Sequence, residues 1–467
     1  MNSKESQHAL FNECMHKQPT MNIGTIGHVA NGKTRLTFCM TEKETQQHST
    51  ELEKNITINI GYGNSKIYKC DTCPAPSSYA PASSSTTEKW CKNKDCVSEA
   101  PMILQRHVSF VDCPGHATFM AIMLNGTCIM DTAILLEAVD NVNTLEPQTI
   151  EHIIATNLTN ISKSLLCMNK CDLPKITPAA ILKKIHNVHE ELKKYKLESV
   201  PIIPISANFG VNIDAVCEYI CTQIPQPIKN LESDAKMYIV RSFNTNKPHS
   251  VVSSSSKSDT LSKIEGGVIG GTLIQGIIKV GDNVMIYPGS INTNKLSKGV
   301  EDDTEPRWTY TPIFATVQSL YSDKNKLEKA IPGGLIGVQL DIDPAFTLEN
   351  GLAGHIMVLD SDTNSKSDIS VFEAFELEFT LIKELAGNDS ELKDGDVIVL
   401  NCNASNVKCV IFKIKKQKLQ LRAIKTPVCA SVGEIMTISK EKNEMGIQIL
   451  GTGKITRGFS SKMVLFD

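Results

Sequence analysis

Short apolar runs alternate with helix-compatible segments through the first half of the chain. The apolar runs predict buried strands over residues 21–26, 108–111, 132–136, 164–168 and 201–205. The segments between them predict helices over residues 35–40, 118–130, 150–157 and 178–195. Such alternation implies right-handed βαβ units and a mainly parallel sheet, with a site at the carboxyl ends of its strands. We therefore expect one α/β domain over residues 21–226.

The pattern changes after residues 227–236, a polar and Pro-containing stretch that we interpret as a linker. Beyond it, Gly, Asp and Pro turns separate short β-rich runs, such as residues 237–240, 270–278, 283–287, 375–381, 396–400 and 408–414. This texture is typical of all-β barrels. We expect two barrel domains, over residues 237–354 and 355–467, and a loop over the Ser-rich residues 250–262.

A phosphate-binding motif follows the first predicted strand. Residues 27–34 read Gly-His-Val-Ala-Asn-Gly-Lys-Thr, which is the P-loop pattern in its required context of strand, loop and helix. The glycines let backbone N–H groups curl around a polyphosphate, and the helix N-terminus adds positive potential. Lys33 would reach the terminal phosphates, and the Thr34 hydroxyl would face Mg²⁺.

Two later segments carry the other groups that a P-loop site needs. Apolar and polar positions alternate over residues 55–62 as in a half-buried strand, and the P-loop upstream makes Thr57 a candidate Mg²⁺ ligand. Asp112 ends the second apolar run, and a Gly-containing turn leads from it to His116. In a P-loop enzyme this position holds a metal-binding carboxylate, a γ-phosphate sensor and a water-positioning group.

Two further strand ends predict a guanine site. The run over residues 164–168 leads into Asn169-Lys170-Cys171-Asp172. Guanine presents N1–H and the N2 amine as neighbouring donors, so the Asp172 carboxylate can accept both, whereas adenine cannot satisfy it. Ser206-Ala207-Asn208 follows the last predicted strand and is a plausible partner loop for the base.

Four cysteines form two pairs within residues 70–96. Two residues lie inside the first pair, seventeen between the pairs and four inside the second, at Cys70, Cys73, Cys91 and Cys96. The spacing resembles a four-thiolate zinc site, whose role would be structural because four protein ligands leave no open position. The Pro- and Ser-rich residues between the pairs cannot build a core, so bound Zn²⁺ would order this insert. The alternative is four unused thiols in a loop.

Composition and charge limit which partners and which cellular compartment the chain can have. The 467-residue chain carries 48 basic and 51 acidic side chains, so it has no global basic field and any nucleic-acid contact must be local. The basic residues between 408 and 422 fit a solvated strand face better than an RNA site. Fifteen scattered cysteines without a secretory signal indicate a reducing compartment, which we take to be the cytoplasm. We expect a flexible tail over residues 1–20 and no membrane span.

In this order, the P-loop, the Asp112 turn and the two guanine loops resemble those of a translational GTPase. The chain is most similar to one family, the gamma subunits of eukaryotic and archaeal translation initiation factor 2. The resemblance rests on the Cys-paired insert and on segments at residues 27–29, 123–126, 146–149, 241–243, 266–268, 280–282 and 331–338. It therefore extends over nearly the whole chain.

This resemblance implies roles for individual residues. Thr34 and Thr57 would coordinate Mg²⁺, and Asp112 would act on it through water. Gly115 would bond the γ-phosphate, and His116 would orient the attacking water. The nucleotide-binding set would be Asn31, Gly32, Lys33, Thr34, Gly115, Asn169, Lys170, Asp172, Ser206, Ala207 and Asn208. The segments around Thr57 and His116 would be switches, ordered by the γ-phosphate and relaxed after hydrolysis.

Two residues depart from the family pattern. Asn31 stands where the family usually has His, and Asn55 stands where it usually has Gly. Replacing Gly removes easy access to positive φ, although Asn is the best substitute for it. We expect these changes to affect the switches and the hydrolysis rate more than nucleotide binding.

The resemblance implies a slow GTPase that needs an activating partner. Bound to GTP, it would carry initiator methionyl-tRNA to the small ribosomal subunit, in a heterotrimer with alpha and beta subunits and with help from GTPase-activating and nucleotide-exchange factors. One alternative is an elongation-type or selenocysteine-type factor that carries another tRNA. A second is a GTP-binding scaffold whose hydrolysis is impaired by Asn31 and Asn55.

Overall fold

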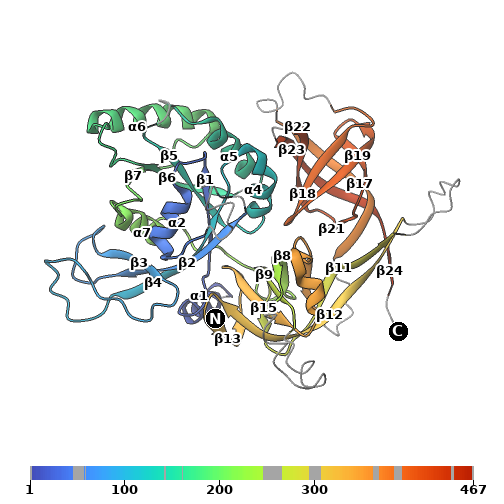
Figure 1. Cartoon of the computed structure of the whole chain (residues 1–467), viewed down its shortest axis with the longest axis horizontal. Helices are drawn as coiled ribbons and strands as arrows, with labels where there is room; N and C mark the ends of the chain where they lie inside the picture. The colour runs from blue at the N-terminus through green and yellow to red at the C-terminus, as the bar shows by residue number, and fades with distance from the viewer. Residues whose placement is uncertain are drawn as a thin grey trace, which may run out of the picture. The chain divides into compact units, whose positions relative to one another are not determined.

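The computed structural model describes residues 3–45, 57, 59–140, 144–159, 161–245, 266–293, 307–360, 368–382, 392–442 and 446–464. It divides into two compact units, drawn together in Figure 1. The first unit contains Met1–Ile228, Asp323–Asn325 and Glu441–Ile447, and the second contains the remainder. Asn55 and the expected loop at residues 250–262 lie outside the described residues.

The first unit is built on a seven-stranded sheet in the order β3-β2-β4-β1-β5-β6-β7. The strands are β1 (Asn22–Gly27), β2 (Gly61–Lys69), β3 (Tyr79–Ser83), β4 (Ile103–Asp112), β5 (Thr132–Ala138), β6 (Ser162–Asn169) and β7 (Ile202–Pro204). From β4 to β7 every pairing is parallel, and β2 and β3 add an antiparallel edge. The expected α/β domain with a mainly parallel sheet is confirmed.

Helices cover both faces of this sheet. They are α2 (Lys33–Thr41), α4 (Met120–Thr127), α5 (Pro147–Leu158), α6 (Pro178–Leu192) and α7 (Ile213–Thr222), with 3₁₀ turns η1 (Ala117–Phe119) and η2 (Lys193–Tyr195). Leu36 of α2 and Val216 of α7 pack on one face against strand residues such as Ile23 and Ile134, and all four are fully buried. Helices α4, α5 and α6 lie on the other face (Figure 1). No helix in the described part of the chain is long and apolar enough to cross a membrane.

Two segments of this unit differ from the expectations. Residues expected to form a flexible tail contain helix α1 (Ser3–Cys14), because Phe11 is buried and the His107 ring donates a 2.9 Å hydrogen bond to the Met15 carbonyl oxygen. Inside the Cys-paired insert, β3 pairs with β2 over Ser65–Ser83 to Lys69–Tyr79. A strand partner, in addition to the cysteines, therefore orders the insert.

The second unit contains two closed six-stranded barrels. The first closes through the order β11-β16-β8-β9-β15-β12 and the second through β20-β19-β18-β22-β23-β17. The first barrel uses β8 (Lys236–Phe243), β9 (Val268–Gln275), β11 (Asn283–Thr293), β12 (Trp308–Ser322), β15 (Ile336–Leu340) and β16 (Ile356–Leu359). The second uses β17 (Ile369–Leu381), β18 (Val397–Cys402), β19 (Ser405–Lys415), β20 (Lys418–Ala423), β22 (Ile435–Lys442) and β23 (Gly446–Ser460). The expected pair of barrels is confirmed.

Smaller elements complete this half of the chain. They are β10 (Ile278–Lys279), β13 (Asn325–Leu327), β14 (Lys329–Ala330), β21 (Val428–Ser431), β24 (Lys462–Met463) and the 3₁₀ turn η3 (Pro344–Asn350). The expected division between residues 354 and 355 does not match the pairing, because β16 pairs with β8 and β11 of the first barrel. The first barrel thus continues to Leu359, and its strand order depends on contacts that are distant in sequence.

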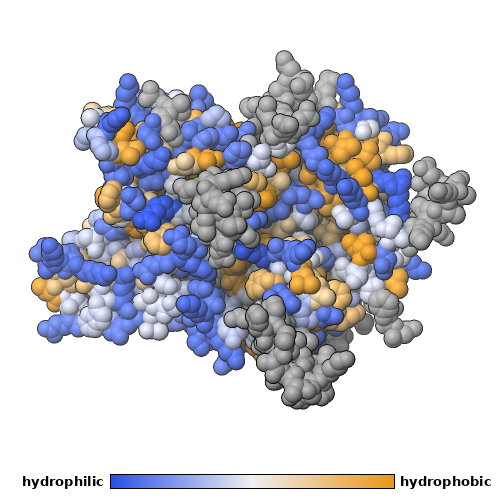
Figure 2. All heavy atoms as spheres, in the orientation of Figure 1, coloured by the Kyte–Doolittle hydropathy of each residue, from blue (hydrophilic) through white to orange (hydrophobic). Residues whose placement is uncertain are grey.

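The outer face of the second barrel mixes basic and apolar side chains. Phe412 is 67 % exposed and Phe459 is 46 % exposed, and Figure 2 shows apolar residues gathered over this barrel. The Lys418 amine lies 2.7 Å from a carboxylate oxygen of the buried Glu376, and Arg457 pairs with the same side chain at 3.2 Å. Two of the basic side chains on this face therefore form ion pairs with Glu376.

Candidate functional site

A cavity of about 390 Å³ lies where β1 ends and α2 begins. Gly32 has φ of +92°, a value that favours glycine, and it places Lys33 at the start of α2. The cavity is lined by Val29, Ala30, Gly32, Lys33, Thr34, Arg35, Phe38, Glu44, Thr57, Gly115 and His116. The structure thus brings together six of the expected site residues, namely Gly32, Lys33, Thr34, Thr57, Gly115 and His116.

Lys33 is the charged group of this cavity. Its amine donates hydrogen bonds to the carbonyl oxygens of Gly27 at 3.0 Å and His28 at 2.8 Å. Burial lowers its pKa to about 8, although the nearby Asp112 acts in the opposite direction. A Cβ on Gly115 would lie 2.4 Å from the Lys33 amine and 2.9 Å from the Val29 backbone nitrogen, so a larger residue here would displace the lysine side chain. Phosphate oxygens would replace the two carbonyl partners on binding.

Oxygen atoms suited to Mg²⁺ gather beside Lys33. The hydroxyl oxygens of Thr34 and Thr57 are 2.9 Å apart, although they come from α2 and from a segment 23 residues later. Asp112 is fully buried and accepts hydrogen bonds from Thr25 at 3.2 Å and Thr45 at 2.8 Å. Burial raises the pKa of the Asp112 carboxyl. Two hydroxyls and one carboxylate are hard oxygen ligands, which fit Mg²⁺.

His116 lies at the rim of the cavity. Its side chain is exposed, and its Nδ1 atom lies 2.7 Å from the Thr118 hydroxyl, two residues further along the same turn. The ring also lies 6.0 Å from the ring of Phe119. Each of these contacts is local in sequence, so the orientation of the imidazole depends on its own turn.

Asn169 connects the phosphate side of the site to the base side. It is 4 % exposed, and its amide donates a 2.8 Å hydrogen bond to the Asn31 carbonyl oxygen in the P-loop. Its side-chain oxygen accepts one from the Ala207 backbone N–H at 3.0 Å. The loops at 27–34 and 206–208 are therefore joined through one side chain.

The other residues expected to contact the base lie in the same two loops as Asn169 and Ala207. Lys170 has φ of +63° and its amine lies 3.2 Å from the Asp140 carboxylate. Asp172 and Asn208 are exposed, and Ser206 accepts a 3.3 Å hydrogen bond from the Phe209 N–H. The Asp172 carboxylate is thus accessible to a base.

The Asn31 side chain points away from the cavity. It is fully buried, and its amide donates to the Leu136 carbonyl oxygen at 3.0 Å and to the Glu137 carboxylate at 3.4 Å. It is not among the residues that line the cavity. Any contact of Asn31 with nucleotide therefore involves its backbone, whereas the side chain belongs to the interior behind the loop.

Five lining residues were absent from the expected site: Val29 and Ala30 within the P-loop, and Arg35, Phe38 and Glu44 beyond it. The Arg35 guanidinium lies 4.9 Å from the Phe38 ring centre and donates a 3.4 Å hydrogen bond to the Asn208 carbonyl oxygen. Positions 35 and 38 are three residues apart on one helix and therefore share a face. That spacing, directly after Thr34, is a sequence signal that could have identified them.

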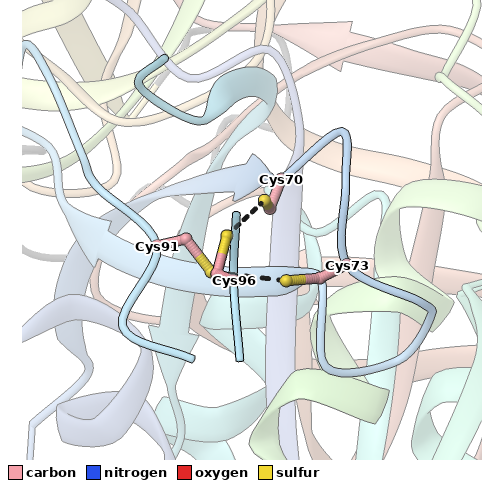
Figure 3. Close-up of side chains that lie close together, drawn as sticks. All are labelled: Cys70, Cys73, Cys91 and Cys96. Carbon is pink, nitrogen blue, oxygen red and sulfur yellow. Dashed lines mark hydrogen bonds between the residues drawn. The ribbon is translucent and has the colours of Figure 1, made fainter. Parts of the chain in front are cut away.

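The four paired cysteines meet in a cluster away from the P-loop cavity. All four sulfur atoms lie within 4.8 Å of one another, and Figure 3 shows their side chains converging. Cys70 and Cys96 are 3.6 Å apart, and Cys73 and Cys91 are 3.7 Å apart. Four thiolates at about 2.3 Å from Zn²⁺ in a tetrahedron have sulfur atoms about 3.8 Å apart. The Cys70–Cys96 and Cys73–Cys91 sulfur–sulfur distances therefore match those expected around a bound Zn²⁺.

Polar groups around the cluster favour thiolates. Hydrogen bonding from Thr72 lowers the pKa of Cys70 to about 6 and also lowers that of Cys96. Burial acts in the opposite direction on Cys73, whose pKa rises to about 12. The Ser98 N–H donates to the Cys96 sulfur at 3.4 Å, and N–H groups of this kind orient and stabilise metal-bound thiolates.

The comparisons with known proteins agree with this geometry. Residues 18–226 match the family described as "Elongation factor Tu GTP binding domain". Two solved structures share the fold with TM-scores of 0.64: a bacterial selenocysteine-specific elongation factor, 17 % identical, and elongation factor SelB from Methanococcus maripaludis with the GTP analogue GppNHp, 19 % identical. This chain is covered to 94 % and 95 %, and it spans 58 % and 80 % of those chains. The protein is thus an elongation-factor-Tu-like GTPase.

Three curated relatives narrow the class. Subunit gamma of eukaryotic translation initiation factor 2 from Encephalitozoon cuniculi is 37 % identical over 96 % of this chain and 94 % of its own. Subunit 3 of the same factor from Drosophila melanogaster is 34 % identical over 97 % and 92 %, and subunit gamma from Schizosaccharomyces pombe is 33 % identical over 96 % and 96 %. Residues 373–455 match the family "Initiation factor eIF2 gamma, C terminal". The chain belongs to the family of gamma subunits of translation initiation factor 2.

Proposed function

We propose that this chain, in its GTP-bound state, carries initiator methionyl-tRNA to the small ribosomal subunit and releases it after hydrolysis. The observation that carries the proposal is similarity along the whole chain, at 33–37 % identity over about 96 % of its residues, to subunits of translation initiation factor 2. Similarity restricted to the GTP-binding domain would support only nucleotide binding.

The residues of the cavity suggest how nucleotide state would control the carrier. Lys33 would hold the β- and γ-phosphates of GTP, and Gly115 would bond the γ-phosphate. Mg²⁺, when bound, would neutralise phosphate charge, held by Thr34 and Thr57 directly and by Asp112 through water. Because Thr57 lies on a separate segment from Thr34, loss of the γ-phosphate would release that segment.

For hydrolysis, we propose that His116 orients the attacking water. Asn169, Lys170 and Asp172 would hold guanine together with the loop at 206–208. Unassisted small GTPases turn over at about 10⁻⁴ s⁻¹, and we expect a similar rate here without a partner. A GTPase-activating factor would then set the time of release, and a nucleotide-exchange factor would reload the protein.

A filter-retention experiment with methionylated initiator tRNA tests the carrier function. The protein is loaded with GDP or with a non-hydrolysable GTP analogue, and the retained tRNA is measured at each protein concentration. Retention should be strong with the GTP analogue and weak with GDP. Equal retention in the two states would overturn the switch.

A selenocysteine-type or elongation-type carrier is the main alternative. The solved structures of that kind share the fold at 17 % and 19 % identity, whereas the initiation-factor relatives are 33–37 % identical. Competition between initiator and elongator tRNA separates the two. A preference for an elongator tRNA would favour the alternative.

The scaffold alternative depends on Asn31 and Asn55. The Asn31 side chain lies in the interior and leaves the cavity lining unchanged, which favours retained hydrolysis. Single-turnover GTP cleavage with and without ribosomes decides the question, because a scaffold would cleave GTP in neither case.

We further propose the setting in which the chain acts. It would assemble with the alpha and beta subunits of the same factor in the cytoplasm. Cys70, Cys73, Cys91 and Cys96 would hold one structural Zn²⁺ that fixes the insert, since their sulfur atoms have tetrahedral spacing.

A further inference from the structure

A buried ion pair lies directly behind the P-loop. Glu137 on β5 and Lys184 on α6 have side chains that are 0 % and 3 % exposed, with a carboxylate oxygen 3.4 Å from the amine. The Lys184 amine also donates to the Ala138 carbonyl oxygen. Glu137 follows two residues of β5, Leu135 and Leu136, that are apolar and fully buried.

The second carboxylate oxygen of Glu137 is connected to the P-loop twice, directly through Asn31 and indirectly through Thr149 of α5. It accepts hydrogen bonds from the Asn31 amide at 3.4 Å and from the Thr149 hydroxyl at 3.0 Å. The Thr149 oxygen in turn accepts a 3.1 Å hydrogen bond from the His28 backbone N–H. One carboxylate is therefore connected to the loop near its start and near its end.

A contribution to stability alone does not account for this arrangement. Burying two charges costs more than packing apolar residues of similar volume in many proteins, so a buried pair is weak support for stability. Nearby, Asp140 and Lys170 form an ion pair that remains partly exposed to solvent. An ion pair in this region therefore does not have to be buried. Glu137 differs from an ordinary ion-pair residue in its other two partners. Asn31 belongs to the P-loop, and Thr149 accepts a hydrogen bond from the P-loop backbone at His28.

We propose that Glu137 is a positioning residue of the nucleotide site, which fixes the curvature of the P-loop through Asn31 and Thr149. Lys184 holds the carboxylate in place and favours its charged form, against burial, which raises the pKa of Glu137 to about 7. The P-loop backbone surrounds phosphates that GTP and GDP share, so this positioning strengthens the binding of both nucleotides equally. The arrangement also explains why the Asn31 side chain points into the interior. Its amide donates a hydrogen bond to the Glu137 carboxylate there.

The test separates hydrogen bonding from charge. Lys184→Met combined with Glu137→Gln removes both charges and keeps an acceptor for Asn31 and Thr149. Lys184→Met combined with Glu137→Leu removes the acceptor as well. We expect the Gln variant to bind fluorescent GDP and GTP analogues within about threefold of wild type, and the Leu variant to bind both about tenfold more weakly, as for loss of a buried hydrogen-bond acceptor.

A double-mutant cycle tests whether Glu137 acts on the P-loop through Asn31. Asn31→Ala should weaken binding in the wild-type background and cause a smaller loss in the Leu variant, because the contact with Glu137 is already gone there and only the hydrogen bond to the Leu136 carbonyl oxygen remains. Cys167→Ala on β6 is the matched control: it opens a cavity in the same buried sheet, lowers the melting temperature and should leave nucleotide affinity unchanged.

Equal affinities of the Gln and Leu variants, with only the melting temperature differing, would overturn the proposal. If the Leu variant does not fold, Thr149→Val replaces it, since it removes the hydroxyl that links Glu137 to His28 and leaves the ion pair intact. Wild-type affinity in that variant would equally contradict the positioning role.

Discussion

The P-loop and the turn that carries His116 lie on the same cavity but are held in different ways. The P-loop is bonded from behind by residues of other elements: Thr149 accepts from His28, and His152 accepts a 3.0 Å hydrogen bond from the Gly27 N–H. His116 is exposed and, among the residues that the structure describes, it forms hydrogen bonds only within its own turn, to Thr118.

This difference assigns binding and hydrolysis to unequal parts of the site. The groups that would receive phosphate are set by a buried framework, so little reorganisation is needed when nucleotide binds. Within the described part of the chain, the imidazole proposed to orient water contacts no such framework. On the proposed roles, retention of nucleotide would therefore follow from the fold, whereas hydrolysis would depend on the groups that fix His116.

His116→Ala gives the sharpest separation of the two sides. We expect single-turnover GTP cleavage on the ribosome to fall about 10²–10⁴-fold, the usual effect of removing a group that assists proton transfer or orients water. The dissociation constant for GTP, measured with a fluorescent analogue, should change less than about twofold, because no P-loop bond involves this ring. A parallel loss of binding would show that the two sides are not separate.

Lys33→Ala tests the opposite side. It removes two charge-assisted hydrogen bonds to phosphate, and we expect GTP and GDP affinity to fall about a hundredfold. Equilibrium titration with a fluorescent nucleotide measures the loss, and the melting temperature without nucleotide serves as the control for folding. An affinity close to wild type would mean that backbone N–H groups alone hold the phosphates.

Above about pH 8, the pH dependence of binding should report the Lys33 amine. Burial lowers its pKa to about 8 in the protein, and phosphate would favour the charged amine. Above about pH 8 the free protein must gain a proton on binding, so GDP affinity should fall about tenfold per pH unit until the amine of the complex also titrates. Titrations between pH 7 and about 9.5 measure the slope. The slope should vanish in Lys33→Ala.

Changes in the cysteine cluster should have the smallest effect on the site. Cys96→Ser removes one of four thiols, and we expect loss of bound zinc in a chromogenic chelator assay and a melting temperature lower by about 5 °C. GDP affinity should stay within about twofold, because the cluster shares no residue with the cavity lining. Wild-type protein that lacks zinc after expression with zinc would contradict the proposed site.

The sequence predicted the parts of the site that depend on local chemistry. The spacing from Gly27 to Thr34 placed a loop and a helix where β1 and α2 have them, because the glycines and the strand pattern act within a few residues. The convergence of Cys70, Cys73, Cys91 and Cys96 was likewise predicted from spacing and is present. At these sites, the bound zinc ion and the roles of the individual residues remain proposals.

The sequence could not predict features that depend on distant partners. The direction of the Asn31 side chain is set by Leu136 and Glu137, more than a hundred residues away. The place of β16 in the first barrel is set by pairing with β8, across more than a hundred residues as well. In both cases the local residues permit several outcomes, and the tertiary contacts select one.

Asn169 has a consequence for nucleotide release. Its amide group is bonded at one end to Asn31 and at the other to Ala207, so a single side chain joins the loop proposed to hold the base to the P-loop. A protein that pulls the loop at 206–208 outward would strain this side chain and, through it, the P-loop. A partner that never reaches the phosphates could therefore shorten the residence time of GDP by acting from the base end alone.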